Sequence, residues 1–164
     1  MHWPPNADGV EWFARQVLPR VRAQVPAARF TAIGKQPSNS RIAIAPDSSI
    51  HLPGYVADLQ SFWERSGAFV VPLRAGGGMR VKILDAWARG VPVVSTRVGA
   101  EGLACSDGEN VLLADTAAEF AEAVVRLLSD RALAERLGKG GRATVERHYN
   151  WRRAYAAWDA VYEG

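Results

Sequence analysis

Residues 72–96 read PLRAGGGMRVKILDAWARGVPVVST. An apolar run leads into three glycines, a stretch with helical apolar spacing follows, and Gly and Pro stand before a second apolar run. This order predicts a buried strand, a glycine loop, a helix over residues 79–89 and a second strand over residues 92–95. The backbone N–H groups and the positive dipole at the start of a helix favour a bound anion. The stretch therefore predicts an anion site at the glycine loop.

Two cations, Arg80 and Lys82, fall in the first predicted turn of that helix. Positive charge is unfavourable there because it faces the positive end of the helix dipole. We interpret the pair as evidence for a negatively charged ligand. Lys82, Asp85 and Arg89 also share one helical face, so a solvated ladder of ion pairs is an alternative interpretation. The three glycines also have an alternative interpretation, as a turn whose only role is to let the strand and the helix pack closely.

The composition favours a soluble, single-domain protein. The chain has 164 residues, with 20 Lys and Arg against 17 Asp and Glu, and the basic residues are scattered. Nucleic-acid binding needs a concentrated basic stripe, so this balance argues against it. Cys105 is the only cysteine, and no signal peptide, membrane span or metal-ligand spacing is found in the sequence. We therefore expect a cytoplasmic protein without structural zinc or disulfides.

Helical and strand patterns alternate along the chain. Residues 7–25 carry a buried stripe and predict a helix capped by Asn6 or Asp8. The other expected elements are strands at 29–33, 49–52, 68–72 and 110–113, a helix at 58–65, and three final helices capped by Thr116 with Glu119, by Ser129 or Asp130, and by Asn150. The 68–72 strand is apolar throughout, which is typical of a strand buried on both faces.

This alternation predicts an α/β fold with a Rossmann-like, doubly wound parallel sheet. We expect one domain over residues 1–164. Its last helices, residues 130–163, are expected to pack either on this domain or on an N-terminal domain outside the sequence.

Further motifs extend the pattern over nearly the whole chain. They are VGAEGL at 98–103, DGENVLL at 107–113 and RHYNW at 147–151. Together with GGGMRVKILDA at 76–86, they resemble the C-terminal, nucleotide-sugar-binding half of retaining GT-B glycosyltransferases of the group 1 (family 4) type. In that family's E-x7-E pattern, the second acidic position falls on Asp85 and the first on Gly77.

The resemblance assigns roles to the candidate residues. Asp85 corresponds to the carboxylate that accepts hydrogen bonds from the ribose hydroxyls of the nucleotide. The resemblance and the charges together assign the other candidates to the diphosphate, the sugar or the base of a nucleotide-sugar donor. These candidates are Gly76, Gly77, Gly78, Met79, Arg80, Lys82, Tyr55 and Glu101. Tyr55 is expected beside the nucleobase and Glu101 at the cleft. Gly77 has no side chain to replace the family's first carboxylate, and no catalytic residue is assigned.

The reaction implied by the resemblance is transfer of a sugar from a nucleoside-diphosphate sugar to a sugar or lipid-linked acceptor, with retained configuration and without a metal or other cofactor. Expected partners are an N-terminal GT-B domain or another chain, and a homodimer is a further expectation. The full enzyme is expected in the cytoplasm, or peripheral to the inner face of the membrane. Two alternatives stay open: a non-catalytic nucleotide-sugar-binding module, and an epimerase or phosphorylase of the same architecture.

The resemblance also predicts a gap in the sheet. In GT-B enzymes a central strand of this domain lies just before the position of Met1. Without this strand, each of its two neighbours has one edge of unpaired backbone N–H and C=O groups, and burying such unpaired groups is costly. Either neighbouring strands close the gap, or another chain or a partner fills it, or the sequence is a fragment of a longer protein.

Overall fold

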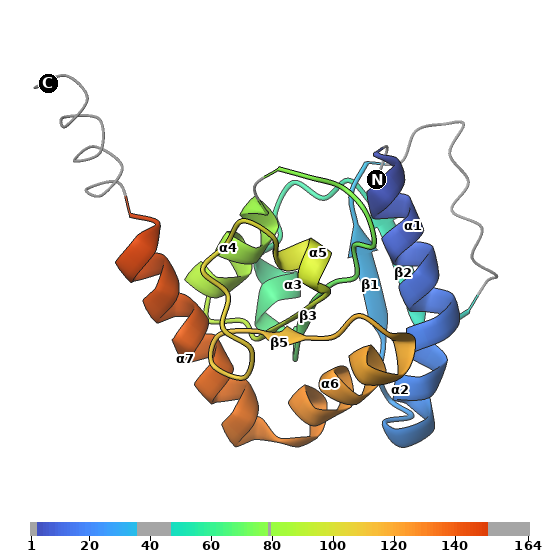
Figure 1. The fold of residues 1–164 in the computed structure, drawn as a ribbon. Helices are drawn as coiled ribbons and strands as arrows, with labels where there is room; N and C mark the ends of the chain where they lie inside the picture. Colours follow the sequence, from blue (N-terminus) through green and yellow to red (C-terminus); the bar gives the residue numbers. More distant parts are fainter. Residues whose placement is uncertain (1–2, 36–46, 79, 151–164) are drawn as a thin grey trace, which may run out of the picture.

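The computed structural model describes residues 3–35, 47–78 and 80–150 (Figure 1). Helices and parallel strands alternate along the chain, in the order α1 Pro4–Trp12, η1 Phe13–Val17, α2 Leu18–Gln24, β1 Phe30–Ile33, β2 Ile50–Gly54, α3 Gln60–Glu64, β3 Phe69–Val71, α4 Val81–Ala88, β4 Val93–Ser95, α5 Arg97–Ala100, β5 Leu112–Leu113, α6 Ala117–Ser129 and α7 Arg131–His148. The predicted α/β, Rossmann-like fold is confirmed.

The strands form two parallel sheets in the described part of the chain. One contains β1 and β2, and the other has the order β3-β4-β5. In the larger sheet Val70 is opposite Val94, which in turn is opposite Leu112. β1 pairs with β2 through Phe30 and Ile50 and has no ladder with β3. The neighbouring strands therefore leave the predicted gap open.

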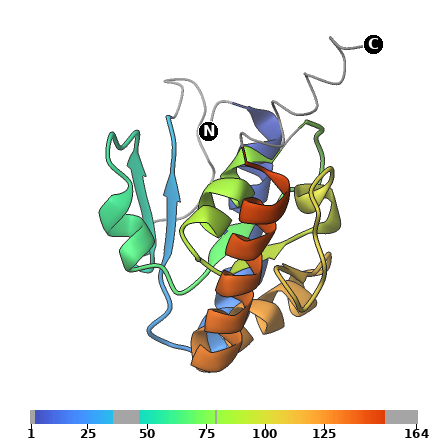
Figure 2. The ribbon, with the colours of Figure 1, turned by 90° about the vertical axis from the view of Figure 1, so that its left-hand side faces the viewer.

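Helices cover both faces of the strands, and each face has its own apolar core. On one face α1, η1, α2 and α6 pack over β1, β4 and β5, with Phe13, Val17 and Phe120 among the buried side chains. On the other face α4 packs over β3 and β4, and Trp87 is its largest buried side chain. Helix α7 lies along α4 (Figure 2). The helices thus form two layers, one on each face of the strands.

The N-terminal helix carries the predicted buried stripe but differs in its start and its continuity. It begins at Pro4 with Trp3 as the N-cap, so the predicted caps Asn6 and Asp8 lie inside it. Proline is favoured in a first helical turn because its missing N–H has no helical partner there. A π-helical segment, η1, interrupts the helix before Pro19. Because proline cannot donate to the preceding turn, it disturbs an α-helix at such a position.

The strand predicted over residues 68–72 is less buried than expected. Val71 is buried, whereas Phe69 and Val70 are only half-buried. The reason is the gap beside β3, because a cavity lies where a neighbouring strand would cover these residues. The strand predicted over residues 49–52 also ends later than expected, since β2 includes Pro53 and Gly54.

The C-terminal helices follow their predicted caps where the structure describes them. Thr116 and Glu119 form a reciprocal capping box at α6, and the Asp130 side chain caps α7. The helix predicted after Asn150 lies outside the described residues. Within the described ranges, no helix combines the length and the apolarity needed to span a membrane.

Candidate functional site

The glycine loop lies between β3 and α4, at the carboxyl end of β3. Gly76 and Gly78 have φ angles of 119° and 89°, which favour glycine. A Cβ atom at Gly76 would also come within 2.5 Å of the Trp3 ring. Gly77 differs, because its φ is not in the left-handed region and a Cβ there would meet no atom within 4 Å. The chain fold therefore explains Gly76 and Gly78, whereas the Cβ side of Gly77 faces open space.

Arg80 holds this loop from inside. It is the N-cap residue of α4 and is only 4% exposed. Its Nη1 donates to the Gly77 carbonyl over 2.8 Å, and its Nη2 donates to the Gly76 and Val98 carbonyls over 2.8 and 3.0 Å. A planar guanidinium can serve several carbonyls at once, which a single ammonium cannot do with the same geometry. Its Nε has no hydrogen-bond partner among the described atoms. Contact of Arg80 with a diphosphate stays a prediction.

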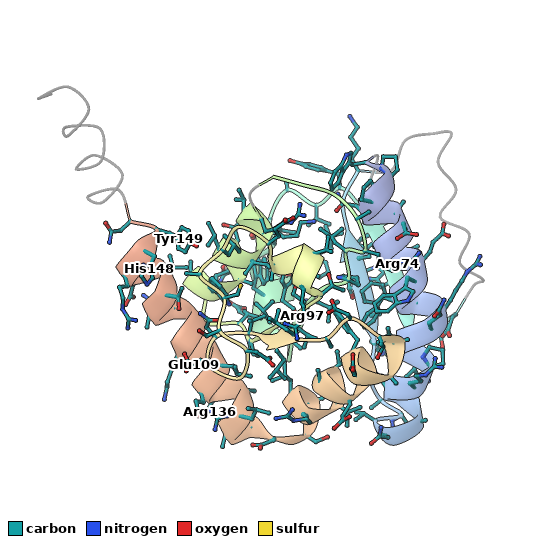
Figure 3. All side chains as sticks on the ribbon, in the orientation of Figure 1. Arg74, Arg97, Glu109, Arg136, His148 and Tyr149 are labelled. Carbon is teal, nitrogen blue, oxygen red and sulfur yellow. The ribbon has the colours of Figure 1, made fainter. Side chains whose placement is uncertain are left out.

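Arg74 anchors the start of the loop to α1. Its Nε donates to Asp8 Oδ2 over 3.0 Å, and the two side chains form an exposed ion pair at the edge of α1 (Figure 3). The loop is thus connected to α1 through Arg74 and to α5 through Arg80. Such connections at both sides favour a fixed loop conformation.

Lys82 and Asp85 line the same cavity beside the loop. The Lys82 Nζ donates to Asn6 Oδ1 over 2.9 Å, and no described carboxylate forms an ion pair with it. Lys82 is an exposed residue, but partial desolvation of its ammonium lowers its pKa, and the positive charge of Arg80 lowers that pKa further. Two cations thus lie close together without a described counter-charge. An anion bound here would relieve their repulsion.

The ion ladder that was the alternative interpretation of α4 does not form among the described contacts. Lys82 bonds to Asn6 instead, and the Arg89 guanidinium lies 5.6 Å from the centre of the Trp63 ring in a cation–π contact. Lys82 and Asp85 are therefore turned to the cavity while Arg89 serves packing.

The cavity has a volume of about 1080 Å³ and extends between β1 and β3. Its lining includes Gly34 and Pro72, which directly follow β1 and β3, and also Asn6, Lys82 and Asp85; we call the part lined by these three its polar end. Open parallel sheets bind ligands at the carboxyl ends of their strands. The polar end of the cavity has this location.

Two other candidates lie away from the cavity wall. Tyr55 follows β2 and is 74% exposed, and Glu101 is an exposed residue at the end of α5. Neither lines the cavity that contains Lys82 and Asp85. Met79 lies outside the described residues. Within the described ranges, no group of His, Cys, Asp and Glu side chains could hold a metal ion.

Sequence reasoning missed two supporting residues. Asn6 was interpreted as a helix cap, but its side-chain oxygen accepts the bond from Lys82. Thr96 caps the unpredicted helix α5 by accepting from the Gly99 N–H over 2.8 Å, and its hydroxyl donates to the Leu73 carbonyl. A threonine directly after a buried strand is a recognisable N-cap pattern, so the signal for α5 was present.

Comparisons with known proteins agree with this architecture. The family model "Glycosyl transferases group 1" matches residues 1–130. A relative described as an uncharacterized 44.6 kDa protein in the cps region of Klebsiella pneumoniae is 24% identical over 162 residues, which are 94% of this chain and 42% of the relative. The chain therefore spans less than half the length of that relative.

Two solved structures share the fold at low sequence identity. A mutant of TarM from S. aureus, in complex with fondaparinux, alpha-GlcNAc-glycerol and UDP, has a TM-score of 0.79 at 18% identity, covering 99% of this chain and 34% of TarM. HepE from Anabaena, in complex with UDP and glucose, has a TM-score of 0.74 at 16% identity, covering 93% of this chain and 45% of HepE. Since the family model matches well over half of the residues, the chain belongs to the group 1 glycosyltransferase family.

Proposed function

We propose that this chain is the donor-binding domain of a glycosyltransferase, and that it binds a nucleoside-diphosphate sugar at the polar end of the cavity. One observation carries the proposal: Lys82 and Asp85 face the same cavity beside an open glycine backbone, and Lys82 has no described carboxylate partner. In this arrangement the diphosphate lies against Gly77 and Lys82. Charge-assisted hydrogen bonds from an ammonium to phosphate oxygens are among the stronger ones in proteins.

Asp85 supplies the complementary contact. Both oxygen atoms of a carboxylate accept hydrogen bonds, so the group can bind the two adjacent hydroxyls of a ribose. Asp85 lies three residues after Lys82 on α4, and both line the cavity. This spacing places a cation for diphosphate and an acceptor for ribose on one helical face. TarM and HepE were both solved with UDP, which supports a uridine nucleotide as the first to test.

The proposed reaction transfers the sugar to a sugar or lipid-linked acceptor with retained configuration and without a metal. Negative charge develops on the leaving diphosphate, and the backbone N–H groups near Gly77 together with Lys82 stabilise it. The acceptor site belongs to a further GT-B domain or to another chain. We place the whole enzyme in the cytoplasm or at the inner face of the membrane, with homodimerisation as a further proposal.

A second candidate is a binding module without transferase activity. Gly77 favours it, because a glycine stands where the family pattern has its first carboxylate, so no side chain there can contact the reacting sugar. Both candidates bind the nucleotide, but only the transferase turns over the nucleotide sugar. Release of UDP from a UDP-sugar in the presence of acceptors distinguishes them.

The binding proposal is tested by thermal unfolding with UDP, GDP, ADP and their sugars. A ligand at 100 times its Kd stabilises the folded state by about 2.7 kcal/mol, which raises the Tm by roughly 5 to 11 °C for a domain of this size. We expect one nucleotide to produce this shift in the wild type and in the control Glu135→Ala, whose carboxylate is exposed on α7. Asp85→Ala should lose most of it. Absence of any shift in the wild type contradicts the proposal.

A further inference from the structure

An aromatic residue lies beside the glycine loop and is left partly in water. Trp3 is the N-cap residue of α1 and is 40% exposed. It has the biggest side chain among the large apolar residues that the described chain leaves exposed, the others being Tyr55, Val81 and Leu128. Tryptophan combines a large apolar surface with an indole N–H, and it is enriched where proteins contact their partners. The exposed part of Trp3 is therefore a candidate contact for a ligand.

The contact of Trp3 with the loop uses the outer edge of its ring. A Cβ atom at Gly76 would lie 2.5 Å from Cη2 of Trp3 and 3.3 Å from each of the two neighbouring ring atoms, Cζ2 and Cζ3. The ring atom closest to Gly76 is thus the outermost one, so the glycine meets an edge of the indole and not the middle of a face. Packing on the loop accounts for this edge, and it does not require that the rest of the ring be exposed.

The first turn of α1 holds Trp3 in a fixed relation to the candidate site. The Trp3 carbonyl accepts hydrogen bonds from the backbone N–H groups of Asn6 and Ala7, over 3.0 and 3.4 Å. Prolines at the first helical positions fix the backbone between them. The side chain of Asn6 accepts the bond from Lys82 over 2.9 Å. One helical turn therefore positions both the indole of Trp3 and the ammonium of Lys82, which lowers the conformational entropy that a ligand would have to remove.

The donor-binding arrangement proposed above has a direction along α4. Asp85 lies about one helical turn beyond Lys82, and Gly77 precedes the helix. A nucleoside-diphosphate sugar joins its parts in the order ribose, diphosphate, sugar. With the ribose at Asp85 and the diphosphate at Lys82 and Gly77, the sugar continues past the start of α4. Gly76 and the ring of Trp3 lie on this side of the loop.

We propose that Trp3 is a sugar-binding residue, and that its exposed indole packs against the C–H groups of the donor's pyranose ring. This inference rests on the proposed function. A pyranose carries C–H groups between its hydroxyls, and the electron-rich face of an indole attracts their positive edge and removes them from water. The nucleotide is held by Lys82 and Asp85, whereas Trp3 contacts only the sugar. Trp3 thus contributes to the choice of sugar and takes no part in binding the nucleoside diphosphate.

Calorimetric titration with UDP, GDP and ADP, and with the glucose and galactose esters of each, tests this role. The quantity compared is the Kd of a sugar nucleotide divided by the Kd of its nucleoside diphosphate. We expect this ratio to rise about 3- to 10-fold in Trp3→Ala, because an aromatic contact to the sugar is lost, and less than about twofold in Trp3→Phe, which keeps an aromatic face. The control is Leu128→Ala, 39% exposed beside Gly67 ahead of β3, which should leave the ratio unchanged. If Trp3 only packs on the loop, Trp3→Ala weakens both ligands alike, and an unchanged ratio overturns the proposal.

Fluorine NMR of the otherwise unchanged chain, labelled with fluorotryptophan, gives a second readout that needs no loss of packing. The chain has six tryptophans, and the Trp3 signal is the one missing from labelled Trp3→Phe. We expect the sugar nucleotide to shift this signal clearly more than the nucleoside diphosphate does. Equal shifts with both ligands would overturn the role of Trp3 while the proposed function stands. A chain that binds none of these nucleotides contradicts the proposed function itself, and this inference with it.

Discussion

The guanidinium of Arg80 donates a 2.8 Å hydrogen bond to the carbonyl oxygen of Gly77. Its other amino group donates to Gly76 and, across 18 residues of sequence, to Val98 on α5. One buried side chain thus holds the loop in a conformation that leaves the Cβ side of Gly77 open. A cation at the start of α4, unfavourable for the helix dipole, is explained in part by this internal role.

Replacing Arg80 should therefore affect folding as well as binding. Arg80→Lys keeps the charge but loses the planar fork, so at least two of the three carbonyl bonds are lost. We expect the free energy of unfolding to fall by about 2 to 4 kcal/mol and the Tm by roughly 5 to 15 °C. The matched control is Arg136→Lys, an exposed position on α7 (Figure 3), with a change within about 0.5 kcal/mol. Similar losses for both variants would contradict the role of Arg80.

Lys82 should make nucleotide binding depend on pH. Partial desolvation and the charge of Arg80 lower its pKa in the ligand-free protein. A bound diphosphate favours the charged ammonium and raises that pKa, so binding takes up a proton at alkaline pH. Affinity should therefore be highest below the pKa of ligand-free Lys82 and fall as the pH rises through it. Calorimetry in two buffers of different ionisation enthalpy measures the proton uptake.

Lys82→Met provides the companion measurement. It should weaken UDP binding by about 10- to 100-fold near neutral pH, because a charge-assisted bond is lost, and the proton uptake should disappear. Lys139→Met, at an exposed position of α7, should leave both unchanged. An unaltered pH dependence in Lys82→Met would assign the proton uptake to another group.

Cys105 should be a poorly reactive thiol. Burial raises its pKa from 9.0 to about 11, so its thiolate fraction at pH 8 is about 100-fold below that of an ordinary cysteine. We expect alkylation by iodoacetamide to be slower in the folded chain than in urea by at least this factor. Because Cys105 is the only cysteine, the unfolded chain is an internal reference. Equal rates would show that the thiol is solvated.

The same pKa has a consequence for stability. A thiol whose pKa is higher in the folded than in the unfolded state contributes to the stability of the folded state as long as the thiol is protonated. This contribution is complete below about pH 9 and is lost as the pH rises toward 11. The free energy of unfolding should therefore fall less between pH 8 and pH 10.5 in Cys105→Ser than in the wild type, as measured by urea unfolding at both pH values.

Patterns within one element predicted much of this fold. The apolar stripe of the first helix, the run before the three glycines and the Thr116 capping box are local, and the structure contains each of them. The start of the first helix was mispredicted although a local signal existed, because Pro4 and Pro5 are typical first-turn residues. Pro19 likewise carried the signal for the π-helical segment.

Contacts between elements that are far apart in the sequence were harder to predict. Arg80 bonds to Val98, and Lys82 bonds to Asn6. Neither pairing follows from spacing, because each depends on how α4 docks beside α5 and α1. The reduced burial of Val70 also depends on the sheet as a whole. The candidate site was thus predictable as a glycine loop with a polar helical face, whereas the partners of its cations required the tertiary structure.

The contact between α7 and the end of α4 gives the last prediction. Gly138 lies in the interior of α7, where Ala has about 1 kcal/mol higher helix propensity than Gly. A Cβ atom there would lie 2.1 Å from the carbonyl oxygen of Gly90, a backbone atom that cannot rotate away. Gly138→Ala should therefore lower the free energy of unfolding by about 1 to 3 kcal/mol, because overpacking outweighs propensity. The neighbouring exposed Lys139→Ala should change it by less than about 0.5 kcal/mol. Urea unfolding in which Gly138→Ala is as stable as wild type would show that α7 does not dock on α4 this closely.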